Sequence, residues 1–336
     1  MRAFILPKPD GIDALQQVER PVPKPGRGQI LVKVHACSLN YRDYAIASGS
    51  YRAGSKPDLI PLSDGAGEVV ETGPDVTKFK TGDRVASCFF QRWTGGEAGP
   101  QAPGSALGGA IDGMLADYAV LEEEGAVAVP DHLSFEEAAS LPCAAVTAWH
   151  ALVDHGGLAA GKTILIQGTG GVSVFALQIA RMFGAAVIGT SSSDAKLARI
   201  AEMGAAHGIN YRTIPDWEKA ALELTGGRGV DQVVEVGGAG TFAKSIAAIR
   251  PGGKVSMIGV LSRQAEINPM IIMAKRANVQ GISVGSTRMF EALNAALAVN
   301  KVKPVIDRTF AFSETKAAYE YLKSAAHFGK IIIRMD

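Results

Sequence analysis

The sequence predicts an α/β protein of two domains, a β-rich N-terminal domain followed by a doubly wound parallel sheet. Its 336 residues are enough for two domains of ordinary size. A strand, a glycine turn and a helix follow one another over residues 163–183, and strand-like runs alternate with helical stretches after them. Short strands separated by turns occupy the first hundred or so residues. We expect one domain at 1–128 and 286–336 and the other at 129–285.

The unit at 163–183 organises the second domain. Four β-favouring residues run from Thr163 to Ile166, and from Val172 onward apolar residues recur with the period of a helix. A glycine turn in this place lets backbone N–H groups approach a phosphate, and the helix behind it presents the positive end of its dipole. The residues expected to hold a pyrophosphate are Gly168, Thr169, Gly170, Gly171 and Val172.

The context of this turn supports a dinucleotide site, because the turn alone is a weak signal. Ser173 stands where the fingerprint has its third glycine, so a glycine-rich turn of some other α/β protein is the alternative. Further strand-like runs at regular intervals give the rhythm of a six-stranded doubly wound sheet. They lie at 184–190, 209–211, 233–236, 254–259 and 279–285.

The end of the second strand of this sheet indicates which dinucleotide is bound. NAD sites place Asp or Glu there to hold the ribose 2′-OH, and here the position is Ser191. Hydroxyls and a lysine suit a 2′-phosphate that a carboxylate would repel, so NADP(H) is favoured over NAD(H). A solvated serine turn is the alternative, and Asp194 is expected to cap a helix over 195–203. The residues concerned are Thr190, Ser191, Ser192 and Lys196.

Composition and charge exclude several classes of protein. The net charge is +1, from 34 basic and 33 acidic residues, and no dense basic run suggests nucleic acid or an anionic membrane. No apolar stretch is long enough for a signal peptide core or a membrane span, so a cytoplasmic protein is expected. Cys37, Cys88 and Cys143 are scattered, which favours reduced, partly buried thiols over disulfides or a four-thiolate zinc site.

The N-terminal domain shows the spacing of a small barrel or sandwich. Its clearest strand covers 29–36, and three shorter runs follow by residue 121. The glycine- and proline-rich segment 94–113 is expected to be a long loop, either a lid or a disordered insertion. Ser134 begins a capping box that opens a helix, and the final strand 330–334 is expected to return to the first domain.

Three segments resemble recurrent motifs of the medium-chain dehydrogenase/reductase superfamily. They are 65–73, 82–85 and 168–172, and the resemblance extends over essentially the whole chain. It implies a GroES-like β-barrel catalytic domain beside a Rossmann domain. Within the superfamily the chain resembles the zinc-independent quinone oxidoreductase-like branch.

The choice of branch depends on three positions that match zinc ligands of the superfamily's alcohol dehydrogenases. Asn40 and Ser63 stand where those enzymes have Cys and His, and only Cys143 keeps its identity. Amide and neutral hydroxyl groups are poor zinc ligands, and the lobe of four structural cysteines is absent, so we expect no metal.

The resemblance also implies roles for individual residues in the cofactor site. Lys196 and Tyr211 match the lysine and tyrosine that hold the adenosine 2′-phosphate in the quinone oxidoreductase branch, which strengthens the expectation of NADP(H). The residues expected near the nicotinamide are Asn40, Thr147, Gly238, Val260 and Val284.

The expected reaction is hydride transfer from NADPH to a small-molecule quinone or α,β-unsaturated carbonyl. Without zinc, the enolate or hydroquinonate needs only a hydrogen-bond donor and a proton. Asn40 is the candidate to hold the acceptor oxygen, and Tyr41 and Tyr51 are candidate donors, each with a purely structural role as the alternative. Asp43 is expected to be structural.

Two other functions remain open on the sequence: an alcohol or carbonyl dehydrogenase of the same superfamily, and a non-enzymatic NADP(H)-binding sensor. Assembly is expected to be a homodimer. The strand 279–285 comes last in its domain and carries no proline or lysine to discourage pairing, so two copies are expected to join along it and bury Ile282 and Val284.

Overall fold

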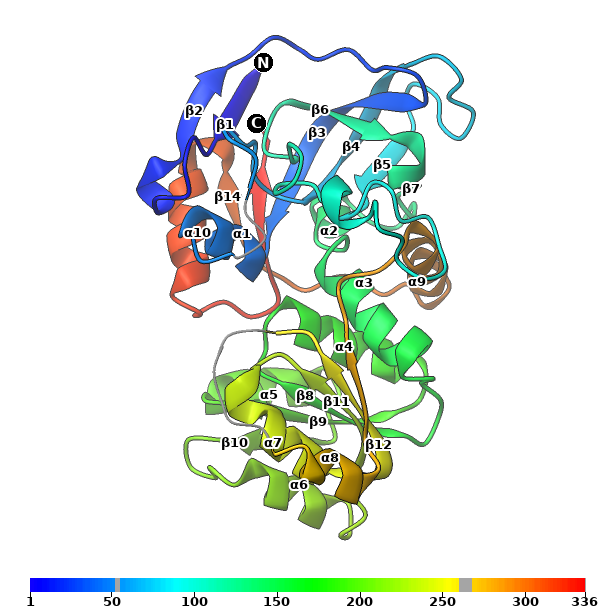
Figure 1. The fold of residues 1–336 in the computed structure, drawn as a ribbon, viewed down its shortest axis with the longest axis vertical. Coiled ribbons are helices and arrows are strands. Elements are labelled where there is room, and N and C mark those ends of the chain that lie inside the picture. The colour runs from blue at the N-terminus through cyan, green and yellow to red at the C-terminus, as the bar shows by residue number, and fades with distance from the viewer. Residues whose placement is uncertain (52–54, 260–267, 336) are drawn as a thin grey trace. The chain divides into compact units, whose positions relative to one another are not determined.

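The computed structural model describes residues 1–51, 55–259 and 268–335 (Figure 1). Its contacts divide the chain into two compact units. Unit 1 comprises Met1–Val146 and Gly285–Asp336, and unit 2 comprises Thr147–Val284. Val260, expected near the nicotinamide, lies outside the described residues.

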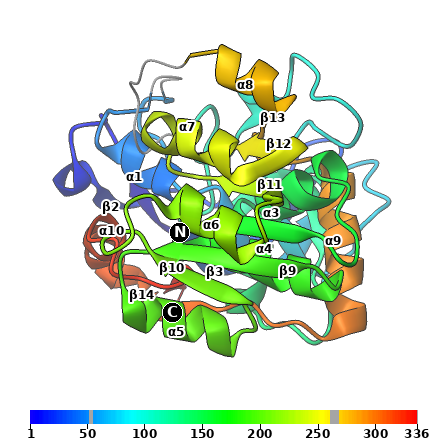
Figure 2. The same cartoon turned by 90° about the horizontal axis from the view of Figure 1, so that it is seen from below.

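Unit 2 is a six-stranded parallel sheet with helices on both faces (Figure 2). The strand order is β10-β9-β8-β11-β12-β13. The chain adds β9 and β10 on one side of β8 and then β11, β12 and β13 on its other side, as in a Rossmann fold. Branched apolar side chains fill its interior because parallel strands are covered on both faces. The strands are β8 (Thr163–Gln167), β9 (Ala186–Ser191), β10 (His207–Asn210), β11 (Val230–Glu235), β12 (Ile249–Met257) and β13 (Asn278–Gly281). The helices are α4 (Gly171–Met182), α5 (Asp194–Glu202), α6 (Trp217–Leu224), α7 (Ala239–Ala248) and α8 (Met270–Lys275), after a π-helical turn at His150–His155.

Two local predictions in unit 2 were wrong. The sixth strand ends at Gly281 instead of residue 285, because its partner β12 ends at Met257, opposite Gly281; Val284, further along, has a left-handed backbone (φ 50°). Ile282 and Val284 are only 6% and 7% exposed in the single chain, so they do not offer the apolar surface expected for a dimer. Helix α5 is capped by Ser193, whose Oγ accepts the N–H of the third helical residue, and not by Asp194.

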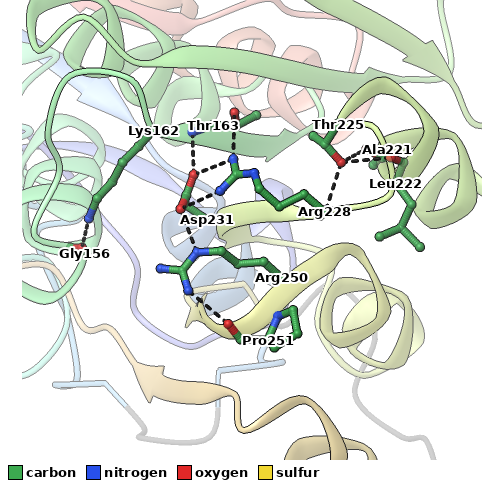
Figure 3. Close-up of polar contacts among 11 residues, drawn as sticks. Gly156, Lys162, Thr163, Ala221, Leu222, Thr225, Arg228, Asp231, Arg250 and Pro251 are labelled. Atoms are coloured by element: carbon green, nitrogen blue, oxygen red, sulfur yellow. Dashed lines mark hydrogen bonds and ion pairs between the residues drawn. The ribbon is translucent and has the colours of Figure 1, made fainter.

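A buried carboxylate joins several elements at the amino-terminal edge of this sheet (Figure 3). Asp231 accepts hydrogen bonds from the Thr163 N–H at 2.9 Å, Arg228 Nη2 at 3.0 Å and Arg250 Nε at 2.7 Å. Burial by itself would raise the pKa of Asp231, but these three donors outweigh it and lower the pKa to about 2. The three strands β8, β11 and β12 are thereby tied to one charge.

Unit 1 is built on a seven-stranded mixed sheet, the GroES-like part of the expected fold. The order is β14-β15-β3-β4-β5-β7, with β6 also paired to β3, and β1 and β2 form a separate hairpin. The strands are β1 (Arg2–Ile5), β2 (Gln16–Glu19), β3 (Gln29–Leu39), β4 (Asp64–Thr72), β5 (Arg84–Ser87), β6 (Tyr118–Glu122), β7 (Ala126–Ala128), β14 (Ile306–Ala311) and β15 (Lys330–Arg334). The helices are α1 (Tyr41–Ala47), α2 (Phe135–Ala139), α9 (Thr287–Asn300) and α10 (Thr315–Lys323), and α3 (Ala144–Trp149) crosses from unit 1 to unit 2.

Several expectations for unit 1 are confirmed. Strand β15 pairs antiparallel with β3, so the C-terminal segment does return to the first domain. Ser134 opens α2 with a full capping box, in which its Oγ and the Glu137 carboxylate each accept the other residue's N–H.

The boundary between the two units differs from the expected one at residue 129. Helix α2 packs on β3 and β4 of unit 1, and unit 2 begins at Thr147.

The glycine-rich segment 94–113 is anchored to unit 1. Leu107 is 2% exposed and its N–H bonds the Phe89 carbonyl oxygen at 3.0 Å. Ala102 and Ser105 are also buried in this segment. The middle of the segment is therefore part of the packed domain.

Candidate functional site

The glycine turn between β8 and α4 is shaped to receive an anion. Gly168 has φ +69°, and its N–H bonds the Thr190 carbonyl oxygen at 2.8 Å, which fixes the turn against β9. A Cβ added at Gly168 or Gly170 would meet no atom within 4 Å. The space beside this backbone is therefore open at the point where α4 begins and its dipole is positive, which suits a pyrophosphate.

Ser173 replaces the third glycine of the fingerprint without loss of packing. Its side chain is buried at 2% exposure, and its Oγ donates to the Gln167 carbonyl oxygen at 2.6 Å. The hydroxyl thus bonds the last carbonyl of β8, and the close contact of helix and strand that glycine usually permits is held by a hydrogen bond instead.

The carboxyl ends of β9 and β10 bring together the residues expected at the adenosine end. Ser191 is buried, its Oγ accepts the Ser193 N–H at 3.2 Å, and its carbonyl oxygen accepts the Tyr211 N–H at 3.0 Å. Lys196 lies in the first turn of α5, directly after these serines. The carboxylate of Asp194 in the same turn accepts a hydrogen bond from Asn210 at 2.7 Å. The position that holds a ribose 2′-OH in NAD enzymes is thus a buried serine.

The residues expected near the nicotinamide within unit 2 show two unusual backbone conformations. Gly238 caps α7 with φ 86° and ψ −144°, a combination that is essentially restricted to glycine. Val284 is left-handed although it is β-branched, and its carbonyl oxygen accepts a hydrogen bond from His150 Nδ1 at 2.8 Å. Thr147 is buried at the start of unit 2.

Unit 1 contains a buried cluster of polar side chains around Lys330, which is the first residue of β15. Its ammonium group donates to Asn40 Oδ1 at 2.7 Å and to the Leu39 carbonyl oxygen at 2.8 Å, and lies 3.7 Å from Asp64 Oδ2. The side chains of Lys330 and Asp64 are 3% and 0% exposed. Asp64 also accepts hydrogen bonds from the Ser63 hydroxyl at 2.7 Å and the Cys143 N–H at 3.2 Å.

The cluster determines the orientation of the Asn40 amide. An ammonium group can only donate, so the amide atom that faces Lys330 must be Oδ1, and Nδ2 points the other way. Nδ2 is buried and has no hydrogen-bond partner within the described part of the chain. Since a buried donor without a partner is costly, this N–H group is a candidate to bind an oxygen of a ligand. The Asn40 backbone N–H donates to Asp43 Oδ2 at 2.8 Å, in keeping with the structural role expected for Asp43.

Burial also governs the protonation of the groups beside this cluster. It raises the pKa of the Asp43 carboxyl to about 7, although the positive charge of Arg42 acts in the opposite direction. It raises the pKa of the Cys143 thiol well above its ordinary range. At neutral pH the sulfur is therefore a neutral thiol.

The donors in this cluster do not suit a zinc ion. The three positions that match zinc ligands hold an amide, a hydroxyl and a thiol whose pKa is raised, and the Lys330 ammonium already lies among them. In the ranges 1–51, 55–259 and 268–335, no three His, Cys, Asp or Glu residues are arranged to hold a metal.

Tyr41 and Tyr51 lie at the surface of the same domain and differ in their surroundings. Tyr41 is 46% exposed, and its ring is 6.0 Å from that of Tyr44. Tyr51 is 37% exposed, and its ring centroid is 5.4 Å from the guanidinium carbon of Arg42. The structure thus gives Tyr51 a cationic neighbour.

Arg42 is the residue of this region that sequence reasoning missed. Its guanidinium lies 4.4 Å from the Phe89 ring and donates to the Leu107 carbonyl oxygen at 2.8 Å. Its Nε is buried without a partner, and no carboxylate of the described residues lies within ion-pair distance. The signal available in the sequence was its position two residues after the candidate Asn40, which places both residues at the start of α1. Arg42 places a fixed positive charge in this domain.

Comparisons with known proteins agree with the fold of both units. Residues 26–131 match the family model of the alcohol dehydrogenase GroES-like domain, and residues 171–299 match that of the zinc-binding dehydrogenases. A zinc-type alcohol dehydrogenase-like protein of Schizosaccharomyces pombe is 44% identical over 335 residues, which cover 97% of this chain and 96% of the relative. The human quinone oxidoreductase is 29% identical over 99% of this chain and 96% of its own.

Among solved structures, an NAD-dependent alcohol dehydrogenase is 31% identical and superposes with a TM-score of 0.91, with both chains covered completely. No helix of the described residues is long and apolar enough to cross a membrane.

Proposed function

Because this chain belongs to the medium-chain dehydrogenase/reductase superfamily and is an oxidoreductase, we propose that it reduces quinones or α,β-unsaturated carbonyls with NADPH and without zinc. The observation that carries the proposal is the Asn40 amide, whose orientation Lys330 fixes and whose buried Nδ2 has no partner among the described residues. A neutral donor of this kind suits an oxygen that gains negative charge.

NADPH, when bound, supplies the hydride. Asn40 Nδ2 donates a hydrogen bond to the acceptor's carbonyl or quinone oxygen, where negative charge develops as the hydride arrives. Lys330 holds Asn40 Oδ1 and so prevents the amide from rotating away. Tyr41 and Tyr51 are the proposed sources of the final proton, since both phenols are partly exposed.

Arg42 adds an electrostatic contribution in this proposal. Burial raises the pKa of both Asp43 and Cys143, and the charge of Arg42 opposes that rise at both groups, so its field reaches the cluster around Lys330. The same field favours an enolate or hydroquinonate over the neutral acceptor.

NADPH is proposed over NADH because Ser191, Lys196 and Tyr211 gather at the ends of β9 and β10. The glycine turn and α4 bind the pyrophosphate in either case. A solved relative is described as NAD-dependent, so the two cofactors need to be compared directly.

A homodimer formed through β13 remains part of the proposal. Strand β13 is an edge of the unit 2 sheet, and Met270 and Met273 on the preceding helix are 55% and 63% exposed. Substitution of Ile282 by proline is unsuitable as a test, because its N–H bonds Met257 within the same chain. Light scattering at micromolar concentration should give about twice the chain mass of 35.1 kDa, and a monomer mass would refute the dimer.

The reaction is tested by a screen of quinones, enones, aldehydes and alcohols with NADPH and NADH, with metal analysis of the same sample. We expect quinones or enones to be reduced with no effect of chelators. Alcohol oxidation that chelators abolish would favour the alternative suggested by the zinc-type relative, an alcohol dehydrogenase.

The role of Asn40 is tested by Asn40→Asp. This change keeps an oxygen for Lys330, replaces the Nδ2 donor with an acceptor oxygen and adds a negative charge that disfavours an oxyanion beside it, so we expect kcat to fall by roughly 100-fold or more while the protein stays folded. Asn300→Asp is the matched control, because the side chain of Asn300 bonds only within the surface of α9. Equal kcat values for Asn40→Asp and the wild type would refute the role.

A further inference from the structure

A buried carboxyl group at the end of β11 is bonded by neutral donors alone among the residues that the structure describes. Glu235 is the last residue of the strand and is 0% exposed. Its Oε1 accepts the backbone N–H groups of Gly237 and Gly238 at 2.8 and 2.9 Å and the Thr241 hydroxyl at 2.6 Å. Its Oε2 accepts the Gln167 Nε2–H at 2.8 Å and the Ser245 hydroxyl. A carboxyl group buried this deeply is tolerated only when several hydrogen bonds satisfy it.

Gln167 joins the same network from the neighbouring strand. It is the last residue of β8 and directly precedes the glycine turn. Its Oε1 accepts the N–H groups of Val236 and Gly237 at 3.2 and 3.1 Å. Its backbone carbonyl accepts the Ser173 hydroxyl of α4. One side chain therefore contacts the loop 236–238 while its own backbone supports the helix behind the phosphate turn.

These two strands are the pair at which the sheet reverses its order. β8 and β11 are hydrogen-bonded neighbours, with Ile166 opposite Val234, one residue before the Gln167–Glu235 contact. In doubly wound sheets, ligands bind outside the carboxyl ends of the strands at this switch point. The network therefore connects two loops that both begin at the expected cofactor site: the glycine turn after β8 and the loop 236–238 after β11.

The loop 236–238 depends on this network for its conformation. The backbone N–H groups of Val236, Gly237 and Gly238 all donate to Gln167 or Glu235, and Gly238 takes a backbone conformation that favours glycine. No basic side chain of the described residues pairs with Glu235. The Glu235 side chain is instead bonded by N–H groups of the loop. A substitution at Glu235 therefore removes hydrogen-bond acceptors from the loop.

We propose that Glu235 and Gln167 are positioning residues that hold the loop 236–238 in register with the glycine turn, so that the nicotinamide half of a dinucleotide is held together with its pyrophosphate. This inference rests on the proposed function, because it requires a nicotinamide cofactor in unit 2. The adenosine half is held at β9 and β10, outside the network, and does not depend on it.

The test compares NADPH with 2′,5′-ADP, which carries the adenosine half and lacks the nicotinamide half. Glu235→Gln replaces one carboxylate oxygen with an NH2 group. Whether that group lies towards Gln167 and Ser245 or towards the loop, it is a donor that faces other donors. We expect the Kd of NADPH to rise at least tenfold and that of 2′,5′-ADP to change less than twofold. We also expect the fluorescence of bound NADPH to move towards that of free NADPH.

A milder pair of variants decides the question if Glu235→Gln does not fold. Thr241→Val removes a donor to Oε1, the oxygen that holds the loop, whereas the control Thr225→Val removes a hydroxyl that bonds the Ala221 and Leu222 carbonyl oxygens at the end of α6, outside the network. We expect Thr241→Val to weaken NADPH at least threefold without effect on 2′,5′-ADP, and Thr225→Val to leave both within twofold.

Three results would overturn the inference. Equal weakening of NADPH and 2′,5′-ADP would show that Glu235 supports only the general fold of unit 2. Unchanged NADPH binding in the folded variants would show that the loop needs no such support. A wild-type protein that binds neither NADPH nor NADH would overturn the proposed function together with this inference, whereas the first two results leave the proposed function standing.

Discussion

Neutralising Asp231 should destabilise unit 2 in a pH-dependent way. In Asp231→Asn the side chain keeps an oxygen for the Thr163 N–H but loses the charge that pairs with Arg228 and Arg250 (Figure 3). The pKa of Asp231 falls from its ordinary value of 3.8 to about 2 in the folded protein. That difference corresponds to about 2.4 kcal/mol, because one pKa unit is about 1.4 kcal/mol. The arginine side chains are 48% and 35% exposed and regain water when the pair is lost, so we expect about 2 kcal/mol at pH 7.

Calorimetry gives the direct measurement. For a unit of this size, about 2 kcal/mol lowers the Tm of its transition by roughly 6–10 °C at pH 7. Asp216→Asn is the matched control, since Asp216 also pairs with a basic side chain but is 55% exposed, and we expect no measurable change there. Because the folded pKa of Asp231 is lowered, its contribution is complete above about pH 4 and disappears as the pH falls towards 2.

The difference between wild type and variant should shrink over that pH range. A difference in Tm that stays constant from pH 7 to pH 2.5 would refute the electrostatic reasoning and point to altered packing instead. A variant as stable as the wild type at pH 7 would show that hydration of the two arginines compensates fully for the loss of their ion pairs with Asp231.

Three further predictions concern the cofactor, the metal and pH. Lys196→Ala should weaken NADPH by roughly 10- to 100-fold, about 1.5–3 kcal/mol, and leave NADH nearly unchanged in a fluorescence titration; equal losses would refute the 2′-phosphate assignment. Purified protein should contain well under one zinc per chain by elemental analysis, and a stoichiometric zinc that supports activity would refute the metal-free mechanism. The raised pKa of Asp43 means that its protonated form contributes stability that is complete below about pH 4 and lost as the pH rises through about 7, so Asp43→Asn should flatten the decline in Tm between pH 4 and 7; an unchanged decline would assign it to another group.

The architecture could be predicted because its signals are local. An unbroken β-favouring run before a glycine turn specifies a buried parallel strand, and β8 is found at Thr163–Gln167. The superfamily was also predictable, since several short motifs keep their order along the chain. The hydroxyl of Ser173 shows why a missing glycine did not mislead the prediction, because the helix still packs on the strand.

The details that sequence reasoning missed depend on tertiary contacts. The run from Val279 to Gly285 favours a strand throughout, and nothing in it shows that Val284 becomes left-handed. Ser193 and Asp194 are both good helix caps, and only the folded chain selects the first. Lys330 is a charged residue before three isoleucines and is typical of the solvated start of a strand, whereas the structure buries it against Asn40 and Asp64. The cofactor and catalytic assignments themselves stay predictions.

The pairing of β15 with β3 has a consequence for how the protein matures during synthesis. Asn40 follows β3 near the beginning of the chain, and Lys330 begins β15, so the contact between their side chains spans 290 residues. Unit 2 is continuous in sequence and can fold while the ribosome is still translating, whereas the sheet of unit 1 waits for β15. A nascent chain can therefore complete unit 2 before it can orient the Asn40 amide, so under the proposed function a chain that stops short of residue 330 should still capture a dinucleotide but not turn it over.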